Sequence, residues 1–333
     1  MERPTSKKVL VTGGTGFVGS HVAELLLARG YAVTCLVRDP DRPAWLRGLN
    51  VDFVQGDCTE PASLDAAVRD VSSVIHLAGC TKARKAREYY RVNHEGTRNV
   101  LAACAGANPG LRKFVLISSL AAAGPSRSGE AILESDEPRP VSDYGKSKLL
   151  AEQEAQLYRD RFPVVILRPS AVYGPRDRDM FELFRWASRG VTISMAGGER
   201  FINPCFVYDL TAAIVRAAET QAPSGSVYDI AEPKGYSWTE FRRTLLDSGG
   251  VTALDISIPV AAAYGIGLVS ELAALFRSRP ALTNRQKIRE AVQRSWLCST
   301  AKAEAELGFR HTTSLEQGMR ITWQWYRDNN WLH

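Results

Sequence analysis

The stretch VLVTGGTGFVGSH, residues 9–21, decides the fold of this chain. A β-branched run precedes its glycines, a helix-period segment follows them, and another apolar run occupies residues 31–37. In this strand–turn–helix context, Gly13, Gly16 and Gly19, with Gly14 in addition, allow the backbone to approach a pyrophosphate, and the helix N-terminus offers free N–H donors. The stretch therefore predicts a dinucleotide-binding turn; the alternative is a glycine-rich turn that binds no ligand.

The rest of the first half repeats this alternation. Apolar runs at 7–13, 31–37, 51–56, 72–79, 113–119 and 163–169 alternate with helix-period segments at 17–29, 61–69, 88–105 and 143–160. Nearly continuous apolar strands separated by helices are typical of a parallel sheet covered on both faces. We therefore predict an α/β fold with a doubly wound parallel sheet, the Rossmann arrangement. The dinucleotide-binding domain would span residues 1–170, and a smaller α/β substrate lobe, interleaved with it, residues 171–333.

The overall composition narrows the class of protein. The 333 residues are 45% hydrophobic and carry a formal net charge of +6, with acids and bases interspersed and no nucleic-acid recognition module. A phosphate-bearing cofactor or an anionic surface would use the same charge. The six cysteines form no CxxC pair and have no histidine cluster beside them, which favours a reduced cytoplasmic protein without a metal site. The first residues show no signal-peptide pattern, so we expect cytoplasmic localisation.

Two further segments have alternative interpretations. Residues 258–276 contain a single charge, Glu271, and approach the length of a membrane span, but Pro259, Gly265 and Gly267 interrupt them. We predict a buried or pocket-lining helix there, with peripheral membrane contact as the alternative. The basic segment TKARKARE (81–88) is predicted to be a solvated helix face; the alternative is a contact for an anionic substrate or a membrane surface.

The end of the second predicted strand bears on the choice of cofactor. An acidic residue there holds the ribose 2′-hydroxyl of NAD, but this strand ends CLVRDP, with Arg38 just beyond it and Asp39 next. A guanidinium matches a 2′-phosphate in charge and geometry. The sequence therefore favours NADP over NAD; the alternative is a solvent-exposed Arg–Asp pair in a turn.

The segment DYGKSK (143–148) contains the candidate proton-transfer group. Tyr144 and Lys148 are separated by four residues and share a helix face, whereas Lys146 points elsewhere. A nearby ammonium lowers the pKa of a phenol from its usual value of about 10. Ser118 and Ser119 end a predicted strand on the same sheet edge, where a hydroxyl can hydrogen-bond a reacting oxygen. Alone, YxxxK is common on surface helices; beside the glycine turn and the serine strand it indicates acid–base chemistry.

Together, these motifs resemble the extended short-chain dehydrogenase/reductase family over nearly the whole chain. The matching motifs, in order, are TGGTGFVG (12–19), GD (56–57), HLAG (76–79), Asn93, SSLAAAG, YGKSK, LRPSAVYGP (167–175) and STAKAEAELGF. The resemblance implies catalysis by Ser119, Tyr144 and Lys148, with Ser118 as the alternative serine, and a homodimer paired through helices 88–105 and 143–160. It also implies cofactor contacts from Gly13, Thr15, Gly16, Phe17, Val18, Gly19, Arg38, Asp57, Cys58, Leu77, Ala78, Gly79, Asn93, Tyr144, Lys148, Pro169 and Val172.

Departures from the family pattern favour one branch of it. Leu120 and Ala121 stand where sugar-nucleotide dehydratases usually have an Asp–Glu pair, and Ile202 stands where epimerases often have an arginine, with Arg200 out of register. The LVRDP segment and the apolar 258–276 stretch resemble the dihydroflavonol reductase and 3β-hydroxysteroid dehydrogenase branch. This implies an NADP(H)-dependent oxidoreductase that interconverts a ketone and a secondary alcohol on an apolar steroid-, lipid- or flavonoid-like substrate. The alternatives are a nucleotide-sugar epimerase with tightly bound NAD and a non-catalytic dinucleotide-binding sensor or assembly factor.

Overall fold

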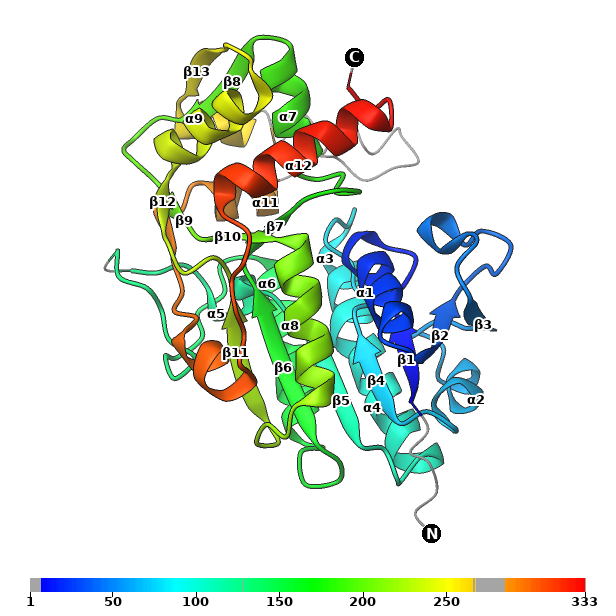
Figure 1. Cartoon of the computed structure of the whole chain (residues 1–333). Coiled ribbons are helices and arrows are strands. Elements are labelled where there is room, and N and C mark those ends of the chain that lie inside the picture. Colours follow the sequence, from blue (N-terminus) through cyan, green and yellow to red (C-terminus); the bar gives the residue numbers. More distant parts are fainter. Residues whose placement is uncertain (1–6, 128, 266, 268–284, 333) are drawn as a thin grey trace.

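The computed structural model describes residues 7–127, 129–265, 267 and 285–332, and its centre is a parallel β-sheet (Figure 1). Seven strands pair in the order β11-β6-β5-β4-β1-β2-β3, and every pairing between neighbours is parallel. The predicted doubly wound fold is confirmed. The strands are β1 (Lys8–Thr12), β2 (Ala32–Val37), β3 (Val51–Gln55), β4 (Ser73–His76), β5 (Lys113–Ile117), β6 (Val164–Pro169) and β11 (Ser226–Ile230).

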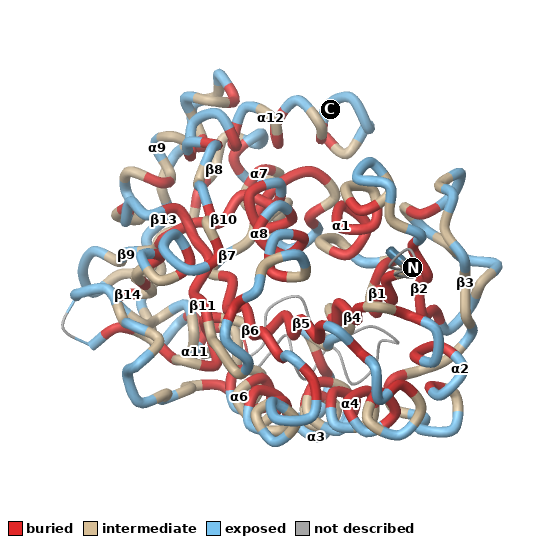
Figure 2. The backbone as a smooth tube through the Cα atoms, turned by 60° about the horizontal axis from the view of Figure 1, so that its bottom comes forward, coloured by how far each residue is buried: buried red, intermediate tan, exposed pale blue. Residues whose placement is uncertain are grey.

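The central strands are mostly apolar and buried because each face of the sheet has its own core. In β1, Val9 and Val11 pack into one cluster and Leu10 into the other, as the two-residue side-chain period of a strand requires. Figure 2 shows these central strands as a buried layer. Helices α1 (Phe17–Ala28) and α8 (Val207–Glu219) cover one face; α2 (Asp65–Val68), α4 (Gly96–Ala107) and α6 (Asp143–Gln156) cover the other (Figure 1).

Shorter elements connect these layers. The helix expected over 88–105 is divided into α3 (Ala86–Tyr89), a π-helical segment η3 (Tyr90–Glu95) and α4. The segment expected over 61–69 is likewise a 3₁₀ turn, η2 (Pro61–Ser63), followed by α2. Two further short elements are the 3₁₀ turn η1 (Ala44–Leu46) and helix α5 (Leu120–Ala123).

The second half of the chain builds a smaller unit over the carboxyl ends of the strands (Figure 1). Its core is aromatic, with Phe184, Phe241, Trp323 and Tyr326 almost fully buried. Among the described residues, its helices include α7 (Phe181–Ser188), α9 (Trp238–Gly249), α11 (Arg285–Ala291) and α12 (Leu315–Asp328). The π-helical segment η4 (Ala303–Leu307) instead packs against α8 and β11 of the main sheet. Its strand pairs are β7 (Ala171–Tyr173) with β10 (Pro204–Phe206), β8 (Val191–Met195) with β13 (Leu254–Ile258), and β9 (Phe201–Ile202) with both β12 (Tyr236–Ser237) and β14 (Ser295–Trp296).

The two halves of the chain share the main sheet. Strand β11 pairs with β6, and α8 packs against α1, although both belong to the second half of the sequence. The precise boundary at residue 170 stays a prediction. Most of the apolar 258–276 stretch lies outside the described residues. Among the residues that are described, no helix has the length and apolarity needed to cross a bilayer.

Candidate active site

The glycine turn between β1 and α1 is packed so closely that side chains cannot fit. Gly13 has φ +73°, and a Cβ there would lie 2.7 Å from the Ala78 nitrogen. A Cβ on Gly19 would lie 2.2 Å from the Gly13 carbonyl oxygen, so this glycine allows the helix to pack on the turn. Gly16, by contrast, is exposed at the N-cap of α1. The turn is therefore accessible to a ligand at the N-terminus of α1, whereas at Gly13 and Gly19 its backbone packs against other backbone atoms.

The N-terminus of α1 suits a negatively charged group. No side chain caps it, and its first turn holds no acidic residue. Its first N–H groups and the positive end of the helix dipole are thus available to a phosphate. Thr15, Phe17 and Val18, three of the predicted cofactor residues, are partly exposed around this end. The residues present fit the pyrophosphate of a dinucleotide.

A buried chain of hydrogen bonds lies beneath the turn, where the strand order reverses between β1 and β4. The Ala78 N–H donates to Thr12 Oγ1 (3.1 Å), which contacts His76 Nδ1 (2.7 Å). His76 Nε2 contacts Thr97 Oγ1 (3.1 Å), and that hydroxyl donates to the Asn93 carbonyl (2.6 Å). Burial lowers the pKa of His76 to about 3, so the ring is neutral. Because Thr97 donates onward, Nε2 carries the proton and Nδ1 accepts from Thr12.

Asn93 links the loop after β4 to the helix that carries Tyr144. Its Oδ1 accepts from the Cys80 N–H (2.7 Å), and its Nδ2 donates to the Cys80 carbonyl (3.0 Å) and to Ser147 Oγ (2.9 Å). Gly79 is exposed beside it, and a Cβ there would lie 3.6 Å from Lys148 Nζ. Leu77 and Ala78 are partly exposed in the same loop. Asn93 is therefore placed to fix this loop rather than to reach far into the site.

Arg38 lies exposed just past β2. The alternative of an Arg38–Asp39 pair is not what the structure shows: Asp39 Oδ2 contacts Arg42 Nε at 3.3 Å. Over the ranges the structure covers, the Arg38 guanidinium makes no ion pair. Burial raises the pKa of the Cys58 thiol to about 12, and the nearby Arg38 charge opposes that rise. The guanidinium thus stands at the end of the sheet next to the loop after β3.

The remaining predicted cofactor residues occupy neighbouring strand ends. Asp57 is partly exposed, and its Oδ1 accepts from the N–H (2.8 Å) and the hydroxyl (2.9 Å) of Thr59. These bonds shape the loop after β3. Pro169 is buried at the end of β6, and Val172 is partly buried in β7. Asp57 and Pro169 thus lie at the carboxyl ends of strands, where open α/β sheets bind ligands.

The two adjacent serines after β5 have different surroundings. The Ser118 hydroxyl donates to Glu152, whose carboxylate also binds Arg168 in a buried pair (Nη2–Oε2 2.7 Å). Ser119 is instead the N-cap of α5, where its Oγ accepts from the Ala121 N–H at 3.2 Å, and it hydrogen-bonds the Tyr144 side chain. The structure therefore brings Ser119, and not the alternative Ser118, to the tyrosine.

Tyr144 lies in the first turn of α6, which Ser142 caps. A Cβ on the next residue, Gly145, would lie 2.2 Å from the Ala121 carbonyl oxygen, so α6 begins in direct contact with α5. Burial raises the pKa of the Tyr144 phenol, while Lys287 and the hydrogen bond with Ser119 lower it.

Lys148 lies one turn further along the same helix and is buried. Its Nζ donates to the Ile117 carbonyl oxygen at 2.6 Å. Burial lowers its pKa to about 8, and the Glu152 carboxylate opposes this effect. The ammonium is therefore still mostly charged at neutral pH and close to the loop that carries Gly79.

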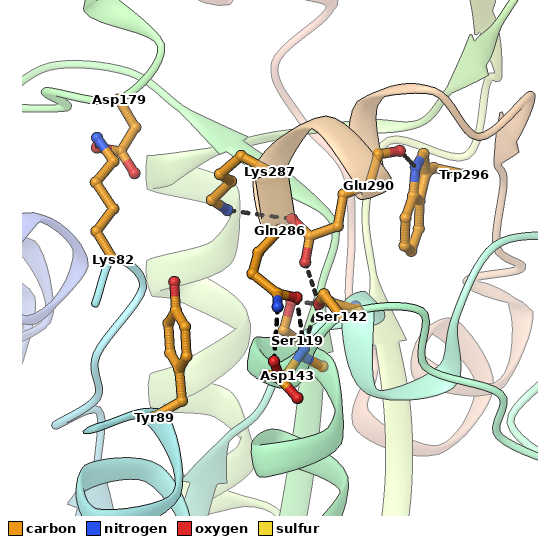
Figure 3. Close-up of polar contacts among 12 residues, drawn as sticks. Lys82, Tyr89, Ser119, Ser142, Asp143, Asp179, Gln286, Lys287, Glu290 and Trp296 are labelled. Atoms are coloured by element: carbon orange, nitrogen blue, oxygen red, sulfur yellow. Dashed lines mark hydrogen bonds and ion pairs between the residues drawn. The ribbon is translucent and has the colours of Figure 1, made fainter. Parts of the chain in front are cut away.

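Helix α11 of the second half adds groups that sequence reasoning missed (Figure 3). Lys287 Nζ lies 5.3 Å from the centre of the Tyr144 ring and 3.2 Å from Glu290 Oε2. On the other side, Lys82 Nζ contacts Asp179 Oδ1 at 2.5 Å. No local motif marks Lys287, Glu290 or Asp179, since only the fold brings them to Tyr144.

Comparison with known proteins agrees with this geometry. A profile of the NAD dependent epimerase/dehydratase family matches residues 9–231. The chain is 31% identical over 327 residues to a ceramide reductase of Caulobacter vibrioides (97% of this chain, 96% of the relative). It is 28% identical over 342 residues to a mouse sterol-4-alpha-carboxylate 3-dehydrogenase, decarboxylating (96% and 91%).

A solved structure supports the same assignment. MoeE5 in complex with UDP-glucuronic acid and NAD is 26% identical and superposes with a TM-score of 0.78, covering 97% of this chain and 99% of MoeE5. The glycine turn, the switch-point loop and the Tyr144 helix together form the ligand end of that shared fold. The chain belongs to the NAD dependent epimerase/dehydratase family, the extended short-chain dehydrogenases/reductases, and is an NAD(P)-dependent enzyme of that family.

Proposed function

We propose that the protein is an NADP(H)-dependent oxidoreductase that interconverts a ketone and a secondary alcohol on an apolar substrate. The observation that carries this proposal is the meeting of Ser119, Tyr144 and Lys148 at the carboxyl edge of the sheet, next to the glycine turn. An acid–base group, a hydroxyl and a buried ammonium near one another suit proton transfer to a carbonyl oxygen. The names of the ceramide and sterol relatives point to lipid substrates for those proteins and support the same class here.

In the proposed mechanism each residue acts on a stated atom. A bound nicotinamide dinucleotide would supply or accept the hydride, with its pyrophosphate held by the glycine turn. Tyr144 delivers its phenolic proton to the carbonyl oxygen during reduction and removes the hydroxyl proton during oxidation. Ser119 donates a hydrogen bond to the same oxygen and holds it in line with the phenol. Lys148 would hold the ribose of a bound cofactor, and its charge favours the phenolate.

Removal of the phenolic hydroxyl tests this mechanism. We expect Tyr144→Phe to lose most turnover while it keeps NADPH affinity, because the ring remains and only the proton donor is absent. The assay follows NADPH oxidation with a panel of long-chain 3-oxoacyl esters, 3-ketosteroids and dihydroflavonols. Isothermal titration with NADPH gives the affinity. Near-normal turnover in the variant would refute the role of Tyr144, and firm NADPH binding without turnover on any panel member would favour the non-catalytic alternative.

The preference for NADP rests on Arg38, which is exposed and pairs with no carboxylate in the described structure. An extended guanidinium that is not engaged elsewhere can bind a 2′-phosphate in two-pronged fashion. We expect Arg38→Ala to weaken NADPH binding by about tenfold or more and to leave NADH binding nearly unchanged. Arg42→Ala is the matched control, because Arg42 already contacts Asp39. Equal effects of Arg38→Ala on both cofactors would contradict the assignment.

The second candidate is a nucleotide-sugar epimerase with tightly bound NAD. The structural similarity to MoeE5 with UDP-glucuronic acid and NAD favours it. Against it stands Ile202, a partly buried apolar residue in β9 at the position where epimerases often have an arginine. Mass spectrometry of the native protein separates the two: co-purified NAD together with thermal stabilisation by UDP-sugars would support the epimerase. The homodimer and the cytoplasmic location stay predictions.

A further inference from the structure

Helix α11 is hydrogen-bonded to Ser142 and Asp143, the two residues directly before Tyr144 (Figure 3). Gln286 Oε1 accepts from the Asp143 N–H (2.9 Å), and Gln286 Nε2 donates to Asp143 Oδ2 (2.6 Å). The Ser142 hydroxyl donates to Glu290 Oε1 at 2.5 Å. The helix is held from its other side by Trp296, whose Nε1 donates to the Glu290 carbonyl (3.0 Å). A helix of the second half of the chain is thus locked onto the N-terminus of the Tyr144 helix.

This attachment places Lys287 against the Tyr144 ring. The ammonium lies 5.3 Å from the ring centre, within the range in which a cation interacts with an aromatic face. Burial alone would lower the pKa of Lys287, but the Glu290 carboxylate and Tyr144 raise it by more. The pKa is therefore above its usual value, and the side chain is charged. A positive charge at this distance stabilises a phenolate more than a phenol.

We propose that Lys287 is a positioning residue that sets the proton affinity of Tyr144, so that the proton-transfer site is complete only when α11 is docked. A catalytic role for Lys287 rests on the proposed function, whereas its effect on the pKa of Tyr144 does not. Lys148 reaches the Ile117 carbonyl from the same helix as Tyr144, whereas Lys287 arrives from more than a hundred residues further along the chain. The second half of the protein thus contributes a charged group to the Tyr144 site.

The groups that face Tyr144 come from six elements or loops, and their charges nearly balance. From α11 come Lys287 and Glu290, and from the loop after β7 comes Asp179, which pairs with Lys82 of the loop after β4. Ser119 hydrogen-bonds the phenol, the Tyr89 ring of α3 packs edge-on at 6.1 Å, and Lys148 lies one turn along α6. Both carboxylates, Glu290 and Asp179, raise the pKa of Tyr144, and Lys287 lowers it. Loss of Lys287 therefore removes the cation that pairs with Glu290 and lowers the pKa of the phenol, whereas Asp179 keeps its pair with Lys82.

Opposite charge changes on α11 should shift the pKa of Tyr144 in opposite directions. We expect Lys287→Met to raise it by about one unit or more, and Glu290→Gln to lower it, because the amide keeps the Ser142 contact but loses the charge. Lys287→Arg should restore the wild-type value. Lys146→Met is the matched control: it removes an exposed lysine from the Tyr144 helix and should change nothing. A purely structural role for Lys287 would give no such pattern of signs.

The measurement is a ¹³C NMR titration of full-length protein labelled at tyrosine Cζ, with and without NADP⁺, in which Tyr144→Phe identifies the Tyr144 signal. Shifts of opposite sign for Lys287→Met and Glu290→Gln, with rescue by arginine, support the proposal. An unchanged Tyr144 titration in Lys287→Met overturns it, whatever the activity of the variants. The titration needs no substrate, so its outcome is separate from the Tyr144→Phe turnover test. If alcohol oxidation is found, its acidic limb should move to higher pH in Lys287→Met, by the same shift of about one unit.

Discussion

Gly145 offers the sharpest test of the site geometry, because two physical effects oppose each other there. It lies inside α6, where alanine is intrinsically favoured over glycine by about 1 kcal/mol. A Cβ at this position, however, would be 2.2 Å from the Ala121 carbonyl oxygen and 3.1 Å from Pro140 Cβ. Restoring an ordinary separation of about 3.4 Å requires α6 to retreat from α5 by about 1 Å. Such overpacking costs about 1–3 kcal/mol, so the clash outweighs the propensity.

We therefore expect Gly145→Ala to lower the free energy of unfolding by about 1 kcal/mol, although it removes a glycine from a helix. A retreat of about 1 Å separates Tyr144 from Ser119, and displacements of that size reduce turnover by about 100-fold. Cofactor affinity should fall much less than turnover, since Lys148 moves with α6 but the glycine turn proposed to hold the pyrophosphate does not. The assays are chemical denaturation, NADPH titration and steady-state turnover.

Gly106→Ala is the matched control. Gly106 is also helical, near the end of α4, but a Cβ there would have no atom within 4 Å. This substitution should stabilise the protein by about 0.5–1 kcal/mol and leave turnover unchanged. If Gly145→Ala were as stabilising as Gly106→Ala and fully active, the contact between α5 and α6 would not determine the position of Tyr144.

Two further predictions concern the groups around these elements. Ser119→Ala should reduce turnover by about tenfold or more and lower the free energy of unfolding only by the contribution of one helix cap. Ser118→Ala should mainly lower the free energy of unfolding, by about 1–2 kcal/mol. Turnover and denaturation measurements on both variants test this, and a larger loss of turnover in Ser118→Ala than in Ser119→Ala would refute it. Burial raises the pKa of Asp229 to about 8 from 3.8, so the folded state keeps a proton that the unfolded chain releases. The free energy of unfolding therefore falls as the pH rises from about 4 to about 8. Asp229→Asn should stabilise the protein more at pH 8 than at pH 5, by at least about 1 kcal/mol in the free energy of unfolding from chemical denaturation. Equal effects at both pH values would contradict this.

Local patterns in the sequence were sufficient to predict the sheet and one half of the site. The strands are apolar on both faces, so periodicity and turn residues locate them without knowledge of their neighbours. The glycine turn and the pair formed by Tyr144 and Lys148 are likewise defined by short spacings on single elements. The choice of Ser119 over Ser118 comes from the family resemblance, and the structure offers a physical reason for it in the contact of Ser118 with the Glu152–Arg168 pair.

The other half of the site depends on contacts between distant segments. The π-helical turn that divides the 88–105 segment at Asn93 leaves no clear local signal, because it contains neither glycine nor proline and its moderate helix formers are also found in ordinary α-helices. Lys287 and Glu290 sit in a short charged helix that by pattern alone is indistinguishable from a solvated surface element. The docking of α11 on Ser142 and Asp143 partly buries them beside Tyr144. Long-range contacts of this kind have no short-range period, which is why the cation at the tyrosine ring was missed.

The charge balance around Tyr144 bears on the two candidate functions. Lys287 and Lys82 are each paired with a carboxylate, Glu290 and Asp179 respectively, so the groups around the phenol carry little net charge. A neutral ketone can enter such a site without leaving a buried charge unpaired, whereas a dianionic diphosphate needs cations that are not already engaged. At the tyrosine end, the described residues therefore suit a neutral carbonyl compound better than the charged part of a nucleotide sugar. A nucleotide sugar would have to place its diphosphate away from these pairs, and Ile202 offers no cation at the position where epimerases often supply one.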